Sequence, residues 1–545
     1  MPRSMTPPWR PLWLMMATSL WMAALGNLPL WQTMHDMGLF TGAKGLVFSG
    51  AMLLVVAGAL LALQSLLAWR WLLKGGVTLL LLVTALGSHY MQAYRVVIDT
   101  TMVVNVLQTN PGEAADLLSL QLLWTLVWLA VLPAWLVWRT PLHYGTWPRR
   151  VLGNLGLLLL GLVVAVAALV VGFAPISSTM RNHKQLRYMI NPLNTVYALG
   201  HVATAPLRLV DKRLQPLGED AQLQARAAAG GKPPVLLLVL GETARAASFG
   251  VLGYGRDTTP ALARQTDLVA QTAIACGTST AASLPCMFAH LGREAYGKRD
   301  ASYENLLDVL QRAGLAVLWL DNQAGCKGLC DRVAHARTAD APPPGLCSGG
   351  ECLDEALLVG LDQRIAALPA ERRARGVVLV LHQMGSHGPA YYKRSPPASK
   401  RFIPECSSAA LQDCSREQVL NAYENTIVYT DQVLAKAIAW LQGRAADFDT
   451  AMLYVSDHGE SLGEAGLYLH GLPYALAPEV QTRVPWLAWF SPAWRERQGL
   501  DLACLRQPVP GLSHDHYFHS VLGLMDVATQ VRQPALDAYA ACRKP

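Results

Sequence analysis

The chain has 545 residues, a net charge of +7 and a hydrophobic fraction of 52%. This length leaves room for more than one domain. The mild positive charge comes without any Lys/Arg-rich run interleaved with aromatic residues, which argues against nucleic acid as a partner. Composition also changes along the chain, because Leu, Val, Ala, Trp and Met dominate up to about Phe173 and ordinary globular sequence begins at about Lys232.

Five apolar segments occupy the N-terminal third of the chain. Most reach the roughly 20 residues that a helix needs to cross the hydrocarbon core, and only the third is shorter. Tryptophans gather at the segment ends, as in an interfacial aromatic belt. We therefore predict a five-helix transmembrane domain over residues 1–175, with spans at Leu12–Trp31, Leu46–Trp69, Gly75–Tyr90, Leu117–Trp138 and Val151–Phe173.

The loops between these spans differ in positive charge. Only Lys44 and Arg95 fall on one side of the five-span arrangement. The side rich in Lys and Arg is expected to be cytoplasmic, which places the N-terminus inside and everything after Phe173 outside. In a bacterium this means a multi-pass inner-membrane protein with a periplasmic C-terminal part. The positive side carries Arg3, Arg10, Arg70, Lys74, Arg139, Arg149 and Arg150.

All ten cysteines lie in the C-terminal half, which favours a disulfide framework in an oxidising compartment. A zinc ribbon is the alternative, but no CxxC pair recurs at ribbon spacing. The sequence leaves the connectivity open. Proximity suggests the pairs Cys276 with Cys286, Cys326 with Cys330, Cys347 with Cys352, and Cys406 with Cys414, with Cys504 and Cys542 left over as a possible fifth.

Two segments outside the spans have distinctive patterns. In the outward loop at 94–117, the polar residues Asn105, Thr109 and Glu113 are spaced so that one helical face would carry all three. This pattern is typical of a solvated amphipathic helix, or of a polar stripe that receives a zwitterionic lipid head group. Residues 176–232 mix basic and apolar residues before an Ala- and Gly-rich stretch, which predicts an interfacial helix followed by a linker.

From residue 233 to 545, short apolar runs alternate with helical patterns. This alternation predicts an α/β domain with a mainly parallel sheet sandwiched by helices. Two of the runs end on potential metal ligands, the first on the carboxylate of Glu242 and the second on Asp457 and His458. Ligands gather where strands of such a sheet finish, so these side chains can converge on the hydroxyl-rich stretch CGTSTAASLPC, which contains Thr280. Taken singly, Glu242 could cap a helix and Asp457 could be a turn residue.

The predicted C-terminal domain contains five longer motifs, which in chain order are LGETARAASFGVLGYGRDTTP, CGTSTAASLPCMF, DNQAGCKGLC, LHQMGSHGPAYYKR and VSDHGESLGEAGLYLHGLPYA. These motifs resemble those of the membrane-bound lipid A phosphoethanolamine transferases, a family that includes the mobilised colistin-resistance enzymes. The resemblance spans nearly the whole chain and implies the alkaline phosphatase and sulfatase fold for the C-terminal domain.

The resemblance implies one zinc ion, with a second possible during turnover. Its ligands would be Glu242, Thr280, Asp457 and His458, a donor set that zinc accepts. Thr280 would be the nucleophile, because metal coordination can generate an alkoxide near neutral pH. His387 and His470 match positions that meet phosphate or a second zinc, and Lys327 matches a substrate contact. Asn105, Thr109 and Glu113 match a donor-lipid groove.

The function implied is a two-step phosphoryl transfer by a monomeric enzyme. Thr280 would take phosphoethanolamine from phosphatidylethanolamine and pass it to a phosphate of lipid A, which lowers the attraction of lipid A for polymyxins. The alternatives are transfer of phosphoethanolamine or phosphoglycerol to core oligosaccharide or another periplasmic glycan, and a non-catalytic membrane scaffold. A sulfatase is disfavoured because the C/S-x-P-x-R motif is missing.

Overall fold

The structure is a computed structural model that describes residues 11–109, 111–208, 211–224 and 231–544. The chain divides into two compact units. The first, called here the membrane unit, comprises Met1–Val103 and Leu118–Ala203. The second comprises Val104–Leu117 and Thr204–Pro545, and is called here the catalytic unit because the sequence predicts that it holds the catalytic domain.

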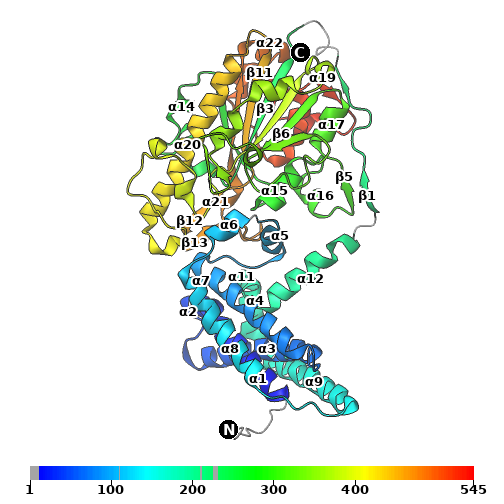
Figure 1. The fold of residues 1–545 in the computed structure, drawn as a ribbon, viewed down its shortest axis with the longest axis vertical. Coiled ribbons are helices and arrows are strands. Elements are labelled where there is room, and N and C mark those ends of the chain that lie inside the picture. The colour runs from blue at the N-terminus through cyan, green and yellow to red at the C-terminus, as the bar shows by residue number, and fades with distance from the viewer. Residues whose placement is uncertain (1–10, 110, 209–210, 225–230, 545) are drawn as a thin grey trace. The chain divides into compact units, whose positions relative to one another are not determined.

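Helices make up the membrane unit (Figure 1). Among the described residues, four helices are long and apolar enough to cross a membrane, at Gly45–Leu66, Leu73–Tyr94, Leu120–Arg139 and Trp147–Val171. The third of these contains one π-helical turn, so it is divided into three consecutive elements. The helices are α1 (Pro11–Ala24), α2 (Leu28–Asp36), α3 (Gly42–Leu66), α4 (Leu73–Tyr94), α7 (Leu120–Leu126), η1 (Val127–Val131), α8 (Leu132–Arg139) and α9 (Trp147–Val171).

The first expected span, Leu12–Trp31, is not one continuous helix. It divides into α1, which has 14 residues, and α2, which begins at Leu28 with Pro29 in its first turn. Proline suits a helix start because it has no N–H to donate, and the same property makes it unsuitable for a helix interior. The described residues therefore contain four spans of full length, plus one shorter apolar helix where a fifth was expected.

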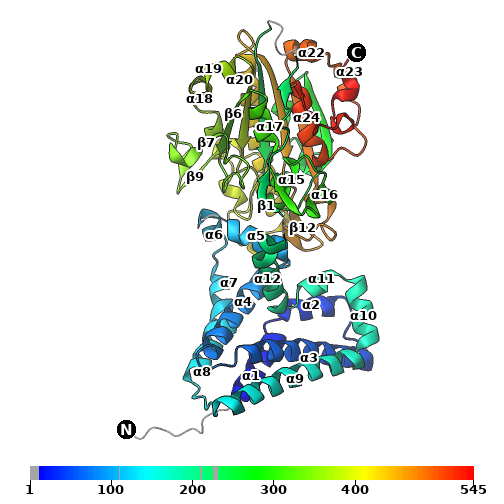
Figure 2. The same ribbon diagram turned by 90° about the vertical axis from the view of Figure 1, so that its right-hand side faces the viewer.

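Helices α3 and α9 pack closely through small residues (Figure 2). A Cβ atom added to Gly58 would meet the Gly161 carbonyl oxygen at 2.7 Å, and one added to Gly161 would meet the Gly58 carbonyl oxygen at 2.6 Å. Small residues at such a crossing let two helix backbones approach, which is a common means of helix association in lipid.

Two further helical expectations need correction. The segment over residues 94–117 forms α5 (Thr100–Gln108) and α6 (Pro111–Asp116). Asn105 lies in α5, Thr109 follows its end, and Pro111 begins α6 because proline disfavours helix at the residue before it. One helical face therefore does not carry Asn105, Thr109 and Glu113. The interfacial region forms three helices instead of one, namely α10 (Phe173–Asn182), α11 (Gln185–Tyr188) and α12 (Leu193–Arg208).

A seven-stranded sheet organises the catalytic unit, with strand order β4-β14-β11-β3-β10-β6-β7. The sheet is mixed. Strand β14 runs antiparallel to both β11 and β4, and the other neighbouring pairs are parallel. The strands are β3 (Pro234–Gly241), β4 (Leu268–Ile274), β6 (Ala316–Asp321), β7 (Ala334–Arg337), β10 (Val377–His382), β11 (Asp449–Ser456) and β14 (Arg483–Phe490).

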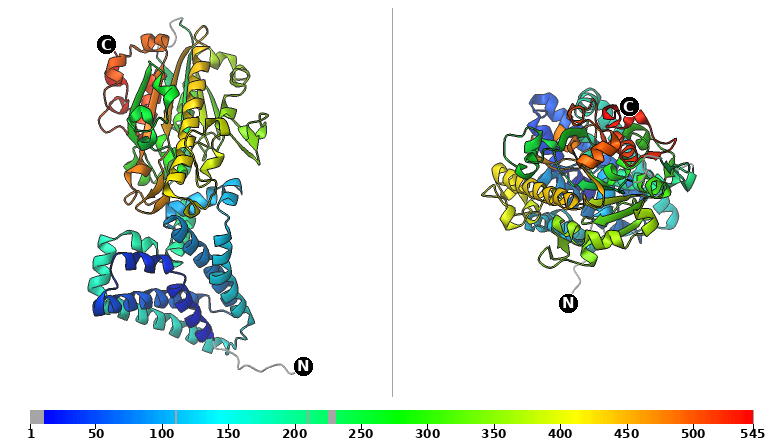
Figure 3. Two further views of the ribbon diagram at one scale, coloured as in Figure 1. Left: turned by 90° about the vertical axis from the view of Figure 1, so that its left-hand side faces the viewer. Right: turned by 90° about the horizontal axis from the view of Figure 1, so that it is seen from above.

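The central strands are buried along their whole length, as expected for strands covered on both faces. On one face, alternate strand side chains pack against helices that include α15, α17 and α24. The long helix α20 lies on the opposite face, as Figure 3 shows in yellow. The helices named are α15 (Thr280–Met287), α17 (Leu306–Arg312), α20 (Arg416–Gln442) and α24 (Tyr517–Leu524).

Short strand pairs and disulfides hold the connecting loops of the catalytic unit. Residues 225–230 of the expected linker lie outside the described residues, and β2 just before them pairs with β15. The five disulfides join Cys276 to Cys286, Cys326 to Cys330, Cys347 to Cys352, Cys406 to Cys414 and Cys504 to Cys542. The minor strands are β1 (Asp211–Gln215), β2 (Gln222–Leu223), β5 (Ala301–Tyr303), β8 (Cys347–Ser348), β9 (Glu351–Cys352), β12 (Ser461–Glu464), β13 (Leu467–Leu469) and β15 (Val527–Ala528).

Candidate active site

The parallel strands β3, β10 and β11 end at the same edge of the sheet. Gly241 is in register with Ser456, and Leu240 with both Val455 and His382. The residues that immediately follow β3 and β11, Glu242 and Asp457, are therefore neighbours in space. This register explains why side chains more than 200 positions apart in the sequence meet at one point.

Four of the predicted site residues form one buried cluster. The Thr280 Oγ1 atom lies 3.0 Å from Glu242 Oε1 and 2.9 Å from Oε2, so the hydroxyl donates to this carboxylate. His458 Nε2 lies 3.5 Å from Thr280 Oγ1, 3.3 Å from Glu242 Oε1 and 3.4 Å from Asp457 Oδ2. All four side chains are at most 5% exposed. The cluster combines one hydroxyl, two carboxylates and one imidazole.

Charge in this cluster is poorly balanced. Burial and the Asp457 carboxylate raise the pKa of Glu242 to about 7. Burial alone would lower the pKa of His458, but the Asp457 and Glu242 carboxylates raise it to about 10. Both pKa shifts reflect two carboxylates that share one buried site. A bound cation would relieve this repulsion.

The geometry of the donors fits a metal ion. Glu242, Asp457 and His458 offer ligand atoms that all lie within 4.8 Å of one another. Asp457 Oδ2 is buried and has no hydrogen-bond partner among the described residues, whereas Oδ1 accepts from the Thr243 and His458 N–H groups. His458 Nδ1 lies 2.9 Å from the Gly459 carbonyl oxygen, which leaves Nε2 facing the cluster. The donor set is one that zinc accepts.

Close packing from β10 keeps Glu242 in place. Gly385 has a φ of 55°, and a Cβ atom there would meet the Glu242 carbonyl oxygen at 2.7 Å. Only glycine is free of both the conformational and the steric penalty at this position. His382, at the end of β10, is buried and its Nδ1 lies 2.9 Å from Asp321 Oδ2.

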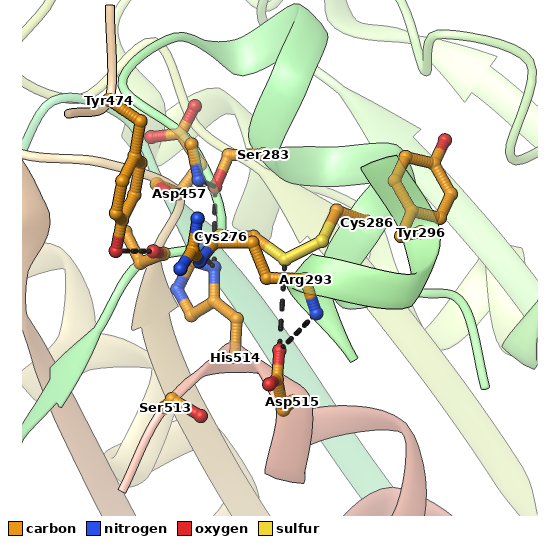
Figure 4. Close-up of a disulfide and its surroundings, with 12 residues drawn as sticks. Cys276, Ser283, Cys286, Arg293, Tyr296, Asp457, Tyr474, Ser513, His514 and Asp515 are labelled. Atoms are coloured by element: carbon orange, nitrogen blue, oxygen red, sulfur yellow. Dashed lines mark hydrogen bonds between the residues drawn. A yellow bond between two sulfur atoms is a disulfide. The ribbon is translucent and has the colours of Figure 1, made fainter. Parts of the chain in front are cut away.

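The disulfide between Cys276 and Cys286 closes a loop (residues 276–286, Figure 4). It is called here the nucleophile loop because it contains Thr280, the predicted nucleophile. Ser279 is the N-cap of α15 and Thr280 is its first residue. The Thr278 hydroxyl donates to the Leu472 carbonyl oxygen at 2.7 Å, and the Gly471 N–H donates to the Thr278 carbonyl oxygen at 2.8 Å. The loop is thus fixed on the side that faces residues 471 and 472.

His514 fixes the same loop on its other side, a role that sequence reasoning missed. The His514 side chain is buried below the loop (Figure 4). The Cys276 N–H donates to His514 Nδ1 at 3.1 Å, and Nε2 lies 3.0 Å from the Ser456 carbonyl oxygen. Burial lowers the pKa of His514 to about 4. A neutral imidazole therefore links the nucleophile loop to the end of β11.

The two predicted phosphate-contacting histidines adjoin the cluster. The His470 ring lies 4.4 Å from the His458 ring and 5.7 Å from the His387 ring, measured between centroids. His470 Nδ1 lies 2.8 Å from Glu460 Oε2, and the Tyr391 hydroxyl donates to the other Glu460 oxygen. Burial, together with neighbouring cationic groups that include Lys327, holds the pKa of His387 well below its usual range. Glu460 is a further buried residue that the sequence did not single out.

Lys327 lies apart from the buried cluster, in the five-residue loop closed by Cys326 and Cys330, called here the lysine loop. Its backbone has a φ of 51°, and Nζ donates to the Ala324 carbonyl oxygen at 3.3 Å. The side chain lines a small cavity instead of the Thr280 cluster. A non-glycine residue in the left-handed region is uncommon and is often found where function requires it.

The segment 104–117 belongs to the catalytic unit. The Thr109 hydroxyl donates to the Asn105 carbonyl oxygen at 2.9 Å, and the side chain of Glu113 lies outside what the structure describes. Asp116 forms ion pairs with Lys393 and Arg394. Because Arg394 Nε also donates to the His387 carbonyl oxygen at 3.1 Å, this segment is connected to the histidine side of the site.

Two family profiles match the chain and together cover most of it. Residues 234–527 match the sulfatase family. Residues 56–207 match the family described as phosphoethanolamine transferase EptA/EptB.

Individual relatives match over nearly their whole length. The chain is 37% identical to "Phosphoethanolamine transferase EptA" of Salmonella typhimurium, covering 98% of this chain and 97% of the relative. It is also 37% identical to "Phosphatidylethanolamine transferase Mcr-1" of Escherichia coli, covering 95% of each. Among solved structures, lipooligosaccharide phosphoethanolamine transferase A (EptA) from Neisseria meningitidis matches with a TM-score of 0.93 and 35% identity, over 99% of this chain and 100% of that one.

Proposed function

Because the chain belongs to the EptA/EptB phosphoethanolamine transferase family, we propose that it moves phosphoethanolamine from phosphatidylethanolamine to a phosphate of lipid A. The observation that carries the proposal is the Thr280 hydroxyl, which donates to Glu242 beside Asp457 and His458 at the start of α15. A buried hydroxyl placed against two carboxylates and an imidazole is an arrangement suited to nucleophilic catalysis.

The transfer proceeds in two displacements at one phosphorus atom. First, Thr280 Oγ1 bonds to the phosphorus of phosphatidylethanolamine and the bond to the diacylglycerol oxygen breaks. The Thr280 proton passes to Glu242, its hydrogen-bond acceptor, and then to the departing diacylglycerol oxygen. Second, an oxygen of a lipid A phosphate bonds to that phosphorus, the bond to Thr280 breaks, and the acceptor's proton returns to Thr280 by the same route. Phosphoethanolamine rests on Thr280 between the two steps.

Zinc is the proposed cofactor, held by Glu242, Asp457, His458 and Thr280. The support is the donor set, the mutual proximity of its atoms and the lack of a hydrogen bond to the buried Asp457 Oδ2 among the described residues. When bound, zinc would lower the pKa of the Thr280 hydroxyl and balance negative charge that develops on the phosphoryl group. His387 and His470 are proposed to meet the phosphoryl oxygens, or a second zinc during turnover.

The donor lipid is proposed to bind at the segment that carries Asn105, Thr109 and Glu113, with Glu113 facing the ethanolamine amine. We place the N-terminus in the cytoplasm and the catalytic unit in the periplasm, with the shorter apolar helix α1 as the fifth crossing, because the loops on the N-terminal side hold most of the basic residues. The enzyme is proposed to act as a monomer, with a membrane domain over 1–175, an interfacial region over 176–232 and a catalytic domain over 233–545. Adding a cationic amine to lipid A would weaken the binding of polymyxins.

Mass spectrometry of lipid A tests the function directly. Lipid A from a Gram-negative host that expresses this chain should gain one phosphoethanolamine group, and a host that expresses Thr280→Ala should show none. Asp457→Asn should lose bound zinc as well as transfer, which separates metal binding from nucleophile chemistry. Unmodified lipid A from a membrane-inserted, zinc-loaded enzyme would contradict the proposal, and modified core oligosaccharide would identify the acceptor in its place.

A further inference from the structure

A second cavity, separate from the buried cluster, lies at the far end of α15. Its volume is about 160 Å³, and it lies between α15, the lysine loop, β5 and the residues after α16 (Arg293–Gly297). Pro285 and Ala289 form the wall on the α15 side. At about 30 Å³ per water molecule this space holds a phosphate group or about five waters.

Three of the residues that line this cavity are basic. Lys327, Arg299 and Arg332 line it, together with a single acidic residue, Glu304. Glu304 already has a cationic partner, since Arg312 Nη2 lies 2.7 Å from its Oε2. Arg332 is also in an ion pair, because two of its nitrogens each lie 2.7 Å from a carboxylate oxygen of Asp308.

Lys327 and Arg299 carry the uncompensated charge. Within the part of the chain that the structure describes, neither is in an ion pair with a carboxylate, and both donate only to backbone carbonyls. Lys327 Nζ donates to the Ala324 oxygen at 3.3 Å and Arg299 Nη1 to the Tyr296 oxygen at 2.8 Å. Arg299 is exposed and its guanidinium group lies 3.7 Å from the centre of the Tyr296 ring, so both cations remain available to attract an anion in the cavity.

A neutral donor completes the lining. His290 contributes to the cavity wall, and its Nδ1 atom is buried without a hydrogen-bond partner among the described residues. Burial lowers the pKa of His290, so the ring is neutral near pH 7. An unsatisfied buried ring nitrogen beside two cations is what an oxygen-rich ligand would satisfy.

The cavity is close to the reacting group. Helix α15 begins at Thr280, and Pro285 lies five residues further along the same helix. At 1.5 Å per residue the two positions are about 8 Å apart along the axis. Lys327 is also among the charges that act on His387, so the cavity and the histidine side of the site share an electrostatic environment.

We propose that this cavity binds a phosphate group of the acceptor other than the one that reacts. Lys327 and Arg299 form charge-assisted hydrogen bonds to its oxygens, and His290 supplies a neutral one. The proposal rests on the proposed function and deepens it, because it makes an acceptor with two phosphates the preferred substrate. It also assigns Lys327 to the acceptor and not to the lipid donor.

The test compares two acceptors with the full-length enzyme in detergent. Bisphosphorylated and monophosphorylated lipid A are offered with phosphatidylethanolamine as donor. We expect the wild type to have a KM at least about tenfold lower for the bisphosphorylated acceptor. Arg299→Gln and Lys327→Gln should each remove most of that preference, while Arg416→Gln, which neutralises an exposed arginine at the start of α20, should keep it.

Binding to an inactive enzyme separates this inference from the proposed function. In a Thr280→Ala background, the Kd of each acceptor is measured with and without Arg299→Gln. A preference for the bisphosphorylated acceptor that Arg299→Gln abolishes supports the cavity assignment even if the wild type transfers nothing. The assignment is overturned if the wild type transfers to both acceptors with equal KM values. It is also overturned if Arg299→Gln raises the KM for both acceptors by the same factor. Either result leaves the proposed function in place.

Discussion

Two short disulfide-closed loops each present one polar side chain, and they are built differently. The nucleophile loop is fixed on both sides by hydrogen bonds to His514, Leu472 and Gly471, and Thr280 within it is buried. The lysine loop has few such contacts, and Lys327 at its tip is partly exposed. A group that forms a covalent bond needs an accurately fixed position, whereas a charged contact tolerates movement of its long side chain.

The largest expected effect on the transfer rate comes from replacing the side chain that each loop presents, Thr280 or Lys327, by an inert one. Thr280→Ala should lower transfer by at least about 10⁴-fold, because no other group replaces the nucleophile. Lys327→Met should lower it by only about tenfold, which is the typical effect of one charge-assisted hydrogen bond. Thr280→Ser is the matched control and should retain part of the activity. Equal losses in Thr280→Ala and Lys327→Met would remove the distinction between the loops.

Removing the His514 link should have the second-largest effect. His514→Phe leaves the Cys276 N–H and the Ser456 carbonyl without their partner, so the nucleophile loop should shift and transfer should fall by about 100-fold. His514→Gln can accept and donate at similar positions and should restore most of the rate. Zinc content should stay at the wild-type level in both variants. A His514→Phe enzyme with full activity would show that the link does not position Thr280.

The same histidine predicts a dependence of stability on pH. Burial lowers the pKa of His514 from 6.5 to about 4, so between these values the unfolded chain binds a proton that the folded chain does not. Stability is therefore fully present above pH 6.5 and declines as the pH falls towards 4. At about 1.4 kcal/mol per pH unit, the lowered pKa of His514 contributes about 3 kcal/mol to the free energy of unfolding above pH 6.5. Thermal melts should show a shallower decline for His514→Gln over this range, and parallel curves would contradict the assignment.

The smallest effect distinguishes the two disulfides. The sequence separations are 10 for Cys276–Cys286 and 4 for Cys326–Cys330. Loop-closure entropy then gives about 2.7 kcal/mol for the first disulfide and about 1.9 kcal/mol for the second. Replacing each pair by serine should lower the melting temperature more for the nucleophile loop. Activity measured below both melting transitions should fall only for that loop, and the reverse order would mean that the lysine loop is the better-positioned one.

Sequence patterns predicted the parts of the fold that depend on local composition. The apolar runs that became β3, β6, β10 and β11 are recognisable because strands covered on both faces need apolar residues throughout. Strand β14 was not singled out, and its antiparallel direction makes the sheet mixed. Strand direction depends on how a connection folds back, which composition does not encode. The break in the first membrane segment was also missed, although Pro29 marks it.

The candidate site also contains residues that local sequence predicts and residues that it does not. Glu242, Asp457 and His458 were predictable because each directly follows an apolar run. The roles of His514 and Glu460 were not predictable, because their partners are distant in sequence or are backbone groups with no side-chain signature. His514 contacts Cys276, which lies 238 positions away, and Ser456, which lies 58 positions away. The helix break at Pro111 likewise separates Asn105 from Glu113, whatever their spacing suggests.

The membership of residues 104–117 in the catalytic unit bears on inhibitor discovery. A soluble fragment that begins after the membrane helices lacks this segment and with it Asp116, the carboxylate that pairs with Lys393 and Arg394. Lys393 would then be free to bind acidic compounds that the intact protein would exclude, whereas Arg394 keeps its ion pair with Glu351. Screening campaigns should therefore use the full-length protein, or counter-screen acidic hits from the fragment against it.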